Sequence, residues 1–226
     1  MGLLDLVVAV ACALPVLARA YALGTLHLWC APSLVTPRLA LCLFGISLNY
    51  VAHAGIWKYP EAFAKLCAKK PLSHLGRHPV AVFAAGELLF KVWQWGCVLA
   101  LLGGSPAPLW RAAADAPNWT KVYGLALAGA GQVLNGAMYA AIGNDGVYYG
   151  FKLGRAVPWC HAFPFNVGLR HPQYVGVVLT LLGLLSVFQS QELAEAGMAM
   201  LIVGWSLMYV YMSLMEELGD NDKKKP

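Results

Sequence analysis

The chain has 226 residues, of which 59% are hydrophobic and only 12% are charged, and its formal net charge is +5. This composition and several apolar runs of membrane-spanning length exclude a soluble globular domain and indicate an integral membrane protein. We expect no nucleic-acid partner.

Six apolar stretches follow one another along the chain. They cover residues 3–22, 39–57, 79–103, 122–142, 174–190 and 196–215. Backbone groups in hydrocarbon must pair within a helix or a closed barrel, and the alternating pattern of a barrel is absent here. The sequence therefore predicts an all-α fold, a polytopic transmembrane bundle of about five to six apolar helices.

The first stretch has two interpretations. Ala18-Arg19-Ala20 follows an apolar run and is similar to the cleavage site of a signal peptide. However, no Lys or Arg precedes that run, and Asp5 lies near its start. We therefore interpret residues 3–22 as a membrane helix that is retained.

Positive charge predicts the orientation of the bundle. The loop from 53 to 78 has a single acid, Glu61, and its cations are Lys58, Lys65, Lys69, Lys70 and Arg77. The loop from 104 to 121 has few cations, so the first loop is expected to be cytosolic, as are both termini. Residues 58–77 are expected to meet anionic lipid headgroups, with 60–70 either an interfacial helix or a solvated linker.

Two charges interrupt the third apolar stretch. Glu87 and Lys91 lie four residues apart, on the same face of a helix. Because isolated charges are costly in hydrocarbon, we expect the two side chains to form an ion pair with each other.

The last two apolar stretches form a predicted helical hairpin. Only residues 191–195 join them, so the two helices must be antiparallel neighbours. This geometry brings the start of one helix to the same membrane face as the end of the other. The side chains that meet there are Arg170, His171, Tyr174, Glu216 and Glu217. The stretch 174–190 is about 25 Å long, short enough to dip into the bilayer without crossing it fully.

The two helix ends have complementary chemistry. Pro172 suits the first turn of a helix, whose free N–H groups and positive dipole, together with Arg170 and His171, favour an anion. Glu216 and Glu217 end a helix, where a bound cation would relieve their conflict with the dipole. A ligand with charges of both signs would fit; the alternative is that these residues only anchor helices at the interface.

The fourth stretch has a face of small residues. They are Gly124, Ala128, Gly129, Gly131, Gly136 and Ala140. Small residues allow two helices to pack closely. The alternative is that they let a ligand approach the backbone.

Several of these motifs resemble one family, the phospholipid N-methyltransferases of the phosphatidylethanolamine and phosphatidyl-N-methylethanolamine type. The likeness runs from Gly146-Val147-Tyr148-Tyr149-Gly150 through Phe163-Pro164-Phe165-Asn166 and Pro172-x-Tyr174-x-Gly176 to Glu216-Glu217. It extends more weakly back to about residue 38. It implies two units: 1–37, a membrane helix and short loop, and 38–226, a methyltransferase domain with its core at 122–217.

The resemblance implies a site for S-adenosylmethionine. The family binds this methyl donor through a Gly-x-Gly and a Glu-Glu pair, which match Gly129-Ala130-Gly131 and Glu216-Glu217. We expect Arg170 and His171 to hold the donor's carboxylate and one glutamate to hold its ammonium. The expected catalytic residues are Glu217, Tyr174 and His171, and no metal is required. The glycines would lie about 20 Å from the cytosolic end of a straight helix, far from the glutamates.

The expected reaction is N-methylation of the ethanolamine headgroup toward phosphatidylcholine. An alkylammonium has a pKa of about 10, so the acceptor must first lose a proton, which a carboxylate in the cleft could relay. The acceptor lipid should enter sideways through an apolar gap beside the site, because extracting its acyl chains into water is costly.

Two departures from the family pattern leave other acceptors open. His171-Pro172-Gln173-Tyr174 resembles the wider group that includes isoprenylcysteine carboxyl methyltransferases, and Leu218-Gly219 replaces the usual Pro-Phe. A sterol-reductase-like protein and a non-catalytic lipid-binding or scaffold protein are further alternatives.

The C-terminal residues indicate a location. Lys223-Lys224-Lys225-Pro226 resembles a dilysine retrieval signal. This predicts the endoplasmic reticulum membrane, or the mitochondria-associated membrane, with a polybasic lipid-binding tail as the alternative.

Overall fold

The computed structural model describes residues 2–158 and 160–221, and every regular element in these ranges is helical. The long helices are α1 (Leu3–Ala22), α2 (Pro37–Lys58), α4 (Pro79–Leu101), α6 (Asn118–Val147), α7 (Pro172–Val187) and α9 (Met198–Asn221). Among the described residues, five of them are long and apolar enough to cross a membrane, and α7 is a shorter apolar helix. The prediction of an all-α membrane bundle is confirmed.

Short helices occupy three of the connections. They are α3 (Pro60–Cys67), α5 (Ala107–Asp115) and α8 (Gln191–Glu195). The helical interpretation of residues 60–70 is confirmed for α3, and its contact with lipid headgroups stays a prediction. We did not expect α5, which forms part of the loop between α4 and α6.

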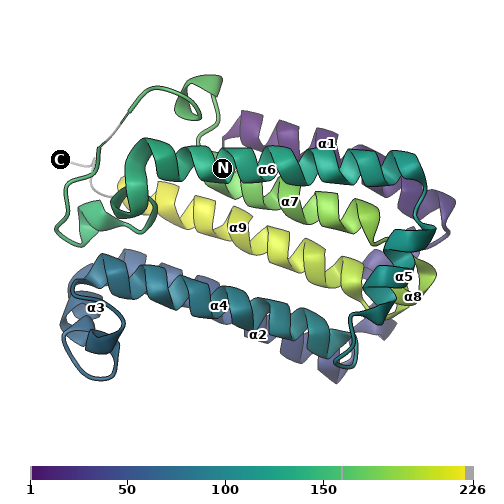
Figure 1. Cartoon of the computed structure of the whole chain (residues 1–226), viewed down its shortest axis with the longest axis horizontal. Coiled ribbons are helices and arrows are strands. Elements are labelled where there is room, and N and C mark those ends of the chain that lie inside the picture. Colours follow the sequence, from purple (N-terminus) through teal and green to yellow (C-terminus); the bar gives the residue numbers. More distant parts are fainter. Residues whose placement is uncertain (1, 159, 222–226) are drawn as a thin grey trace.

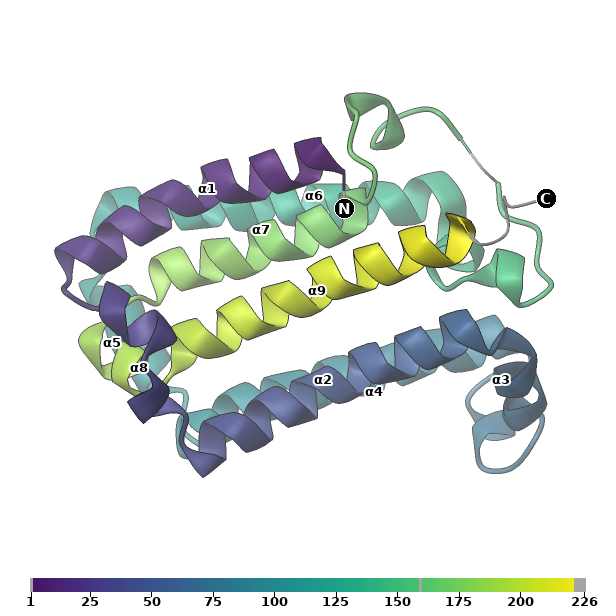
Figure 2. The ribbon, with the colours of Figure 1, turned by 180° about the vertical axis from the view of Figure 1, so that it is seen from behind.

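The long helices run roughly along one direction (Figure 1). α7 packs against α6, α1 and α9, while α2 packs against α9 and α4. Seen from behind, α1 lies beside α7 and in front of α6, and α9 separates α7 from the α2–α4 pair (Figure 2). α7 and α9 are therefore antiparallel neighbours, as the short connection between them predicted.

The start of α7 and the end of α9 lie at one end of the bundle. The start of α1 lies there too, because the backbone N–H of Arg170 donates to Asp5 at 3.0 Å. Both ends of the described chain thus lie at the same membrane face. That this face is cytosolic, and that the chain divides at residue 37, stay predictions.

Small residues allow α6 and α7 to pack closely. A Cβ atom added at Gly124 would lie 2.6 Å from the carbonyl oxygen of Gly183, and one at Gly131 would collide with the carbonyl oxygen of Gly176. Such distances leave no room for a side chain, so backbone meets backbone at this interface.

A glycine redirects α6 near its end. Gly143 has φ of +63° and ψ of −177° inside the helix, a backbone conformation that favours glycine. The predicted stretch ended at residue 142, one residue before this kink. The kink turns residues 144–147 and the segment after them toward the start of α7.

The expected ion pair between Glu87 and Lys91 is wrong. The Glu87 carboxylate instead lies 2.6 Å from the Nε2 atom of His53 and accepts a hydrogen bond from Asn49. The Lys91 ammonium donates to the hydroxyl of Tyr209 at 3.1 Å and to Gln94. Tertiary neighbours on α2 and α9, which helical spacing does not reveal, take the place of the intrahelical partner.

Candidate active site

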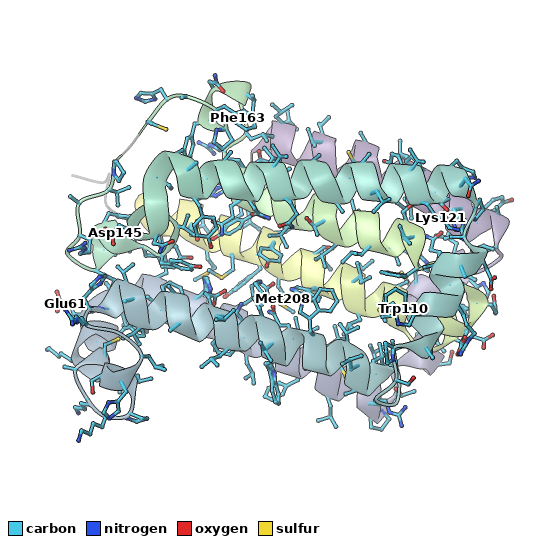
Figure 3. The ribbon with its side chains drawn as sticks, in the orientation of Figure 1. Glu61, Trp110, Lys121, Asp145, Phe163 and Met208 are labelled. Atoms are coloured by element: carbon cyan, nitrogen blue, oxygen red, sulfur yellow. The ribbon has the colours of Figure 1, made fainter. Side chains whose placement is uncertain are left out.

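A cavity of about 370 Å³ lies where α7 begins and α9 ends. It is on the same side of the bundle as the labelled residues Asp145 and Phe163, far from Lys121 and Trp110 (Figure 3). The predicted site residues that line it are Arg170, His171, Tyr174, Glu216 and Glu217. The hairpin has thus brought together the five side chains that the sequence placed at one membrane face.

Glu216 is held by two tyrosines. Its Oε1 atom accepts a hydrogen bond from Tyr149 at 2.6 Å and another from Tyr174. The two hydroxyl oxygens lie 3.4 Å apart, and the side chain of Glu216 is 13% exposed. Hydrogen bonds to a carboxylate are stronger than those between neutral groups, so the two tyrosines hold the Glu216 side chain in a fixed orientation.

Glu217 faces two basic groups. Its Oε1 atom lies 3.1 Å from the Nη1 atom of Arg170 and 3.4 Å from the Nε2 atom of His171. The other ring nitrogen of His171 lies 3.7 Å from Glu216, so the imidazole stands between the two carboxylates. The Arg170 side chain is 68% exposed, which leaves donors of its guanidinium accessible to a ligand.

Asp5 of α1 positions the segment before α7. Its carboxylate accepts from the backbone N–H of Arg170 at 3.0 Å and from that of Gly2 at 2.9 Å. The Asp5 residue is fully buried. The sequence showed Asp5 only as a charge near the start of an apolar run, because a contact across 165 positions leaves no local pattern.

Aromatic residues close the other side of the cavity. Tyr149 adopts a left-handed conformation with φ of 56°, and its ring lies 5.1 Å from that of Trp57. Trp57 lies in the last turn of α2, and the ammonium of Lys152 lies over it, 3.4 Å from the centre of its ring. The sequence indicates no role for Trp57, and it shows Tyr149 only as a member of the motif from Gly146 to Gly150.

The predicted Gly-x-Gly segment lies elsewhere. Gly131 is buried against α7, whereas Gly129 and Ala130 are exposed on the outer face of α6. None of the three lines the cavity. The structure places Gly131 in helix packing, and cofactor binding by Gly129, Ala130 and Gly131 stays a prediction.

Substituting alanine for Gly131 or Gly129 distinguishes a role in helix packing from a role in cofactor binding. Gly131→Ala is expected to destabilise the protein by about 1–3 kcal/mol, because its Cβ would overlap α7. Gly129→Ala is the matched control, since nothing lies within 4 Å of a Cβ there. Thermal unfolding in detergent measures both. Weaker donor binding by Gly129→Ala with unchanged unfolding would instead favour a cofactor role.

Comparisons with known proteins agree with this geometry. Residues 119–218 match the model of the phospholipid methyltransferase family. The chain is also 30% identical, over 181 residues, to a phosphatidyl-N-methylethanolamine N-methyltransferase of Arabidopsis thaliana, covering 80% of this chain and 93% of the relative. No solved structure matches the chain significantly. With its helical bundle and its cavity of paired charges, the chain belongs to the phospholipid methyltransferase family and is a membrane methyltransferase.

Proposed function

We propose that this protein transfers methyl groups from S-adenosylmethionine to the amine of ethanolamine phospholipids, in steps that lead toward phosphatidylcholine. The observation that carries the proposal is the meeting of Glu216 and Glu217 with Arg170 and His171 in one cavity at a membrane face. The name of the Arabidopsis relative supports an acceptor of this class.

The cavity fits the charges of the proposed donor. Arg170 and the start of α7 would hold its carboxylate, and Glu217 would hold its ammonium. The rings of Tyr149 and Phe165 line the cavity as well, and aromatic faces attract a cation such as a sulfonium. When bound, S-adenosylmethionine supplies a methyl group whose bond to sulfur breaks, with both electrons staying on sulfur, as the acceptor nitrogen forms the new bond to carbon.

The contribution of the chain itself is alignment and charge. Tyr174 and Tyr149 fix the Glu216 carboxylate, and His171 lies between both glutamates, so the charged groups need little reorganisation when ligands bind. Holding two reactants in line can supply a large part of a rate enhancement.

An acceptor panel tests the proposed reaction. Purified protein is given methyl-labelled S-adenosylmethionine with phosphatidylethanolamine, its monomethyl and dimethyl forms, or a prenylcysteine. We expect label in at least one ethanolamine phospholipid and none in the prenylcysteine. Label only in the prenylcysteine would establish a carboxyl methyltransferase. If equilibrium dialysis showed no binding of S-adenosylmethionine, the protein would instead be a lipid-binding or scaffold protein.

The proposed location is the endoplasmic reticulum membrane, with α3 resting on anionic headgroups. α3 carries Lys65 in its last turn and is followed by Lys69 and Lys70, which suits an anionic surface. The motif Lys223-Lys224-Lys225-Pro226 lies outside the described residues, so the proposal rests there on the sequence alone.

A further inference from the structure

A second cavity, of about 420 Å³, lies inside the bundle between α4 and α6. α9 runs behind the space between these two helices, where Figure 3 labels Met208 (Figures 1 and 3). Leu88 of α4 and Tyr139 of α6 line the cavity and are 67% and 37% exposed. The cavity therefore reaches the lateral surface of the bundle, where lipid lies.

The two cavities meet at a shared wall. Val147, Tyr149, Gln173 and Tyr174 line both of them. Tyr149 and Tyr174 are the residues that hold Glu216 on the other side of this wall. A ligand that enters from the lipid side would thus approach the first cavity at these tyrosines.

The second cavity contains opposite charges that form no direct ion pair. Glu87 and Lys91 both line it, one helical turn and about 6 Å apart along α4. Among the residues that the structure describes, no carboxylate oxygen lies within 4.0 Å of the Lys91 ammonium, whose hydrogen bonds go to Gln94 and Tyr209. Ionisable groups at this depth are costly and commonly mark a binding site.

His53 has a ring nitrogen available toward the shared wall. An ionised carboxylate can only accept a hydrogen bond, so for a neutral imidazole the contact of 2.6 Å between Glu87 and Nε2 selects the tautomer with its proton on Nε2 and a lone pair on Nδ1. Tyr149 lies 3.5 Å from Nδ1, but its single hydroxyl proton is donated to Glu216 at 2.6 Å. Glu87 and His53 therefore form a carboxylate–imidazole pair with the accepting nitrogen near the wall.

We propose that the second cavity binds the headgroup of a zwitterionic aminophospholipid, with its amine at His53 and its phosphate at Lys91. This inference rests on the proposed function, and it assigns the acceptor site and the base. The headgroup carries a cation and an anion close together, and the Glu87–His53 pair and the Lys91 ammonium provide the complementary charges in one cavity. The acyl chains leave between α4 and α6.

His53 removes the proton that blocks the acceptor nitrogen. The N–H bond of the ammonium breaks, the proton goes to Nδ1 of His53, and the electron pair stays on nitrogen as the nucleophilic lone pair. The resulting imidazolium is stabilised by the Glu87 carboxylate, and the pair changes from a net charge of −1 to neutral. Tyr149 and Glu216 then connect His53 with the first cavity, from which the proton reaches water.

The role of His53 as the base is tested with His53→Asn. The control is His27→Asn, at an exposed position at the opposite end of the bundle. His53→Asn is expected to lower kcat by about 100-fold or more at pH 7. KM for short-chain phosphatidyl-N-methylethanolamine and donor affinity by dialysis should stay within about threefold of wild type. The deficit should shrink as pH approaches about 9.5, because more acceptor is then already deprotonated.

The phosphate contact is tested with Lys91→Gln, with Lys91→Arg as the conservative variant and Lys121→Gln as the control. Lipid binding can be measured without the methyl donor. Trp95 and Trp205 line the second cavity, so their fluorescence reports a titration with short-chain phosphatidyl-N-methylethanolamine. Lys91→Gln is expected to raise the midpoint of the lipid titration and the KM for the lipid about tenfold, with kcat little changed. Lys91→Arg is expected to restore the midpoint and KM to wild-type values. Thermal unfolding confirms that each variant is folded.

Three results would overturn the assignment. They are wild-type kcat in His53→Asn at every pH, an unchanged midpoint in Lys91→Gln, and binding of water-soluble N-methylphosphoethanolamine in place of the lipid. A wild-type protein that binds the lipid with the expected dependence on Lys91 but methylates no acceptor would instead contradict the proposed function. The two failures are therefore distinguishable.

Discussion

Glu216→Gln is expected to lower kcat/KM for methyl transfer by about 100-fold or more. The carboxylate accepts hydrogen bonds from Tyr149 and Tyr174, and each such bond to a charged group contributes about 1.5–3 kcal/mol. Glutamine keeps the size of the side chain and one accepting oxygen but removes the charge, so the two tyrosines lose their charge-assisted hydrogen bonds. Initial rates with a labelled methyl donor measure the effect.

Glu192→Gln is the matched control for this substitution. Glu192 pairs with Arg111 on α5, and both side chains are more than half exposed. Exposed ion pairs contribute little, so this variant should keep wild-type activity and unfolding temperature. Equal activity of Glu216→Gln and Glu192→Gln would show that the tyrosine-bound carboxylate has no part in transfer.

Glu217→Gln is expected to weaken donor binding about 10-fold and to lower kcat/KM by about 10- to 100-fold. In the proposed site Glu217 holds the donor's ammonium, and a charge-assisted hydrogen bond is about twice as strong as a neutral one. Equilibrium dialysis with labelled S-adenosylmethionine measures the affinity, and initial rates measure the transfer.

A double variant separates ligand binding from ion pairing. Glu217 also lies 3.1 Å from Arg170, so its loss leaves that guanidinium without its partner. If the pair were only structural, Arg170→Gln combined with Glu217→Gln would recover activity, because both charges are then removed. Since Arg170 is proposed to hold the donor's carboxylate, we expect the double variant to bind the donor even more weakly than either single variant.

The helices and the hairpin could be predicted because their causes are local. Apolar length predicted the membrane helices, and the short connection at 191–195 was enough to place Arg170 and His171 beside Glu216 and Glu217. Apart from His171, which lies between them, the glutamates contact different neighbours, as their angular spacing on a helix implied.

The remaining features depend on contacts between distant segments. The partner of Glu87 is His53 on another helix, and the residue that orients the start of α7 is Asp5 of α1. Neither contact has a periodic signature in the sequence. The role of Tyr149 depends on its left-handed backbone after the kink at Gly143, a conformation that no motif reveals.

The shortness of α7 is compatible with a membrane because protein surrounds this helix. Its 16 residues give a helix of about 24 Å, whereas the hydrocarbon core of a bilayer is about 30 Å thick. Every residue of α7 is buried or half-buried, and α1, α6 and α9 pack against it, so the longer helices face the lipid in its place. Irregular backbone is tolerated at membrane depth where protein buries it, so the polar segment before α7 can lie deeper than the headgroup layer.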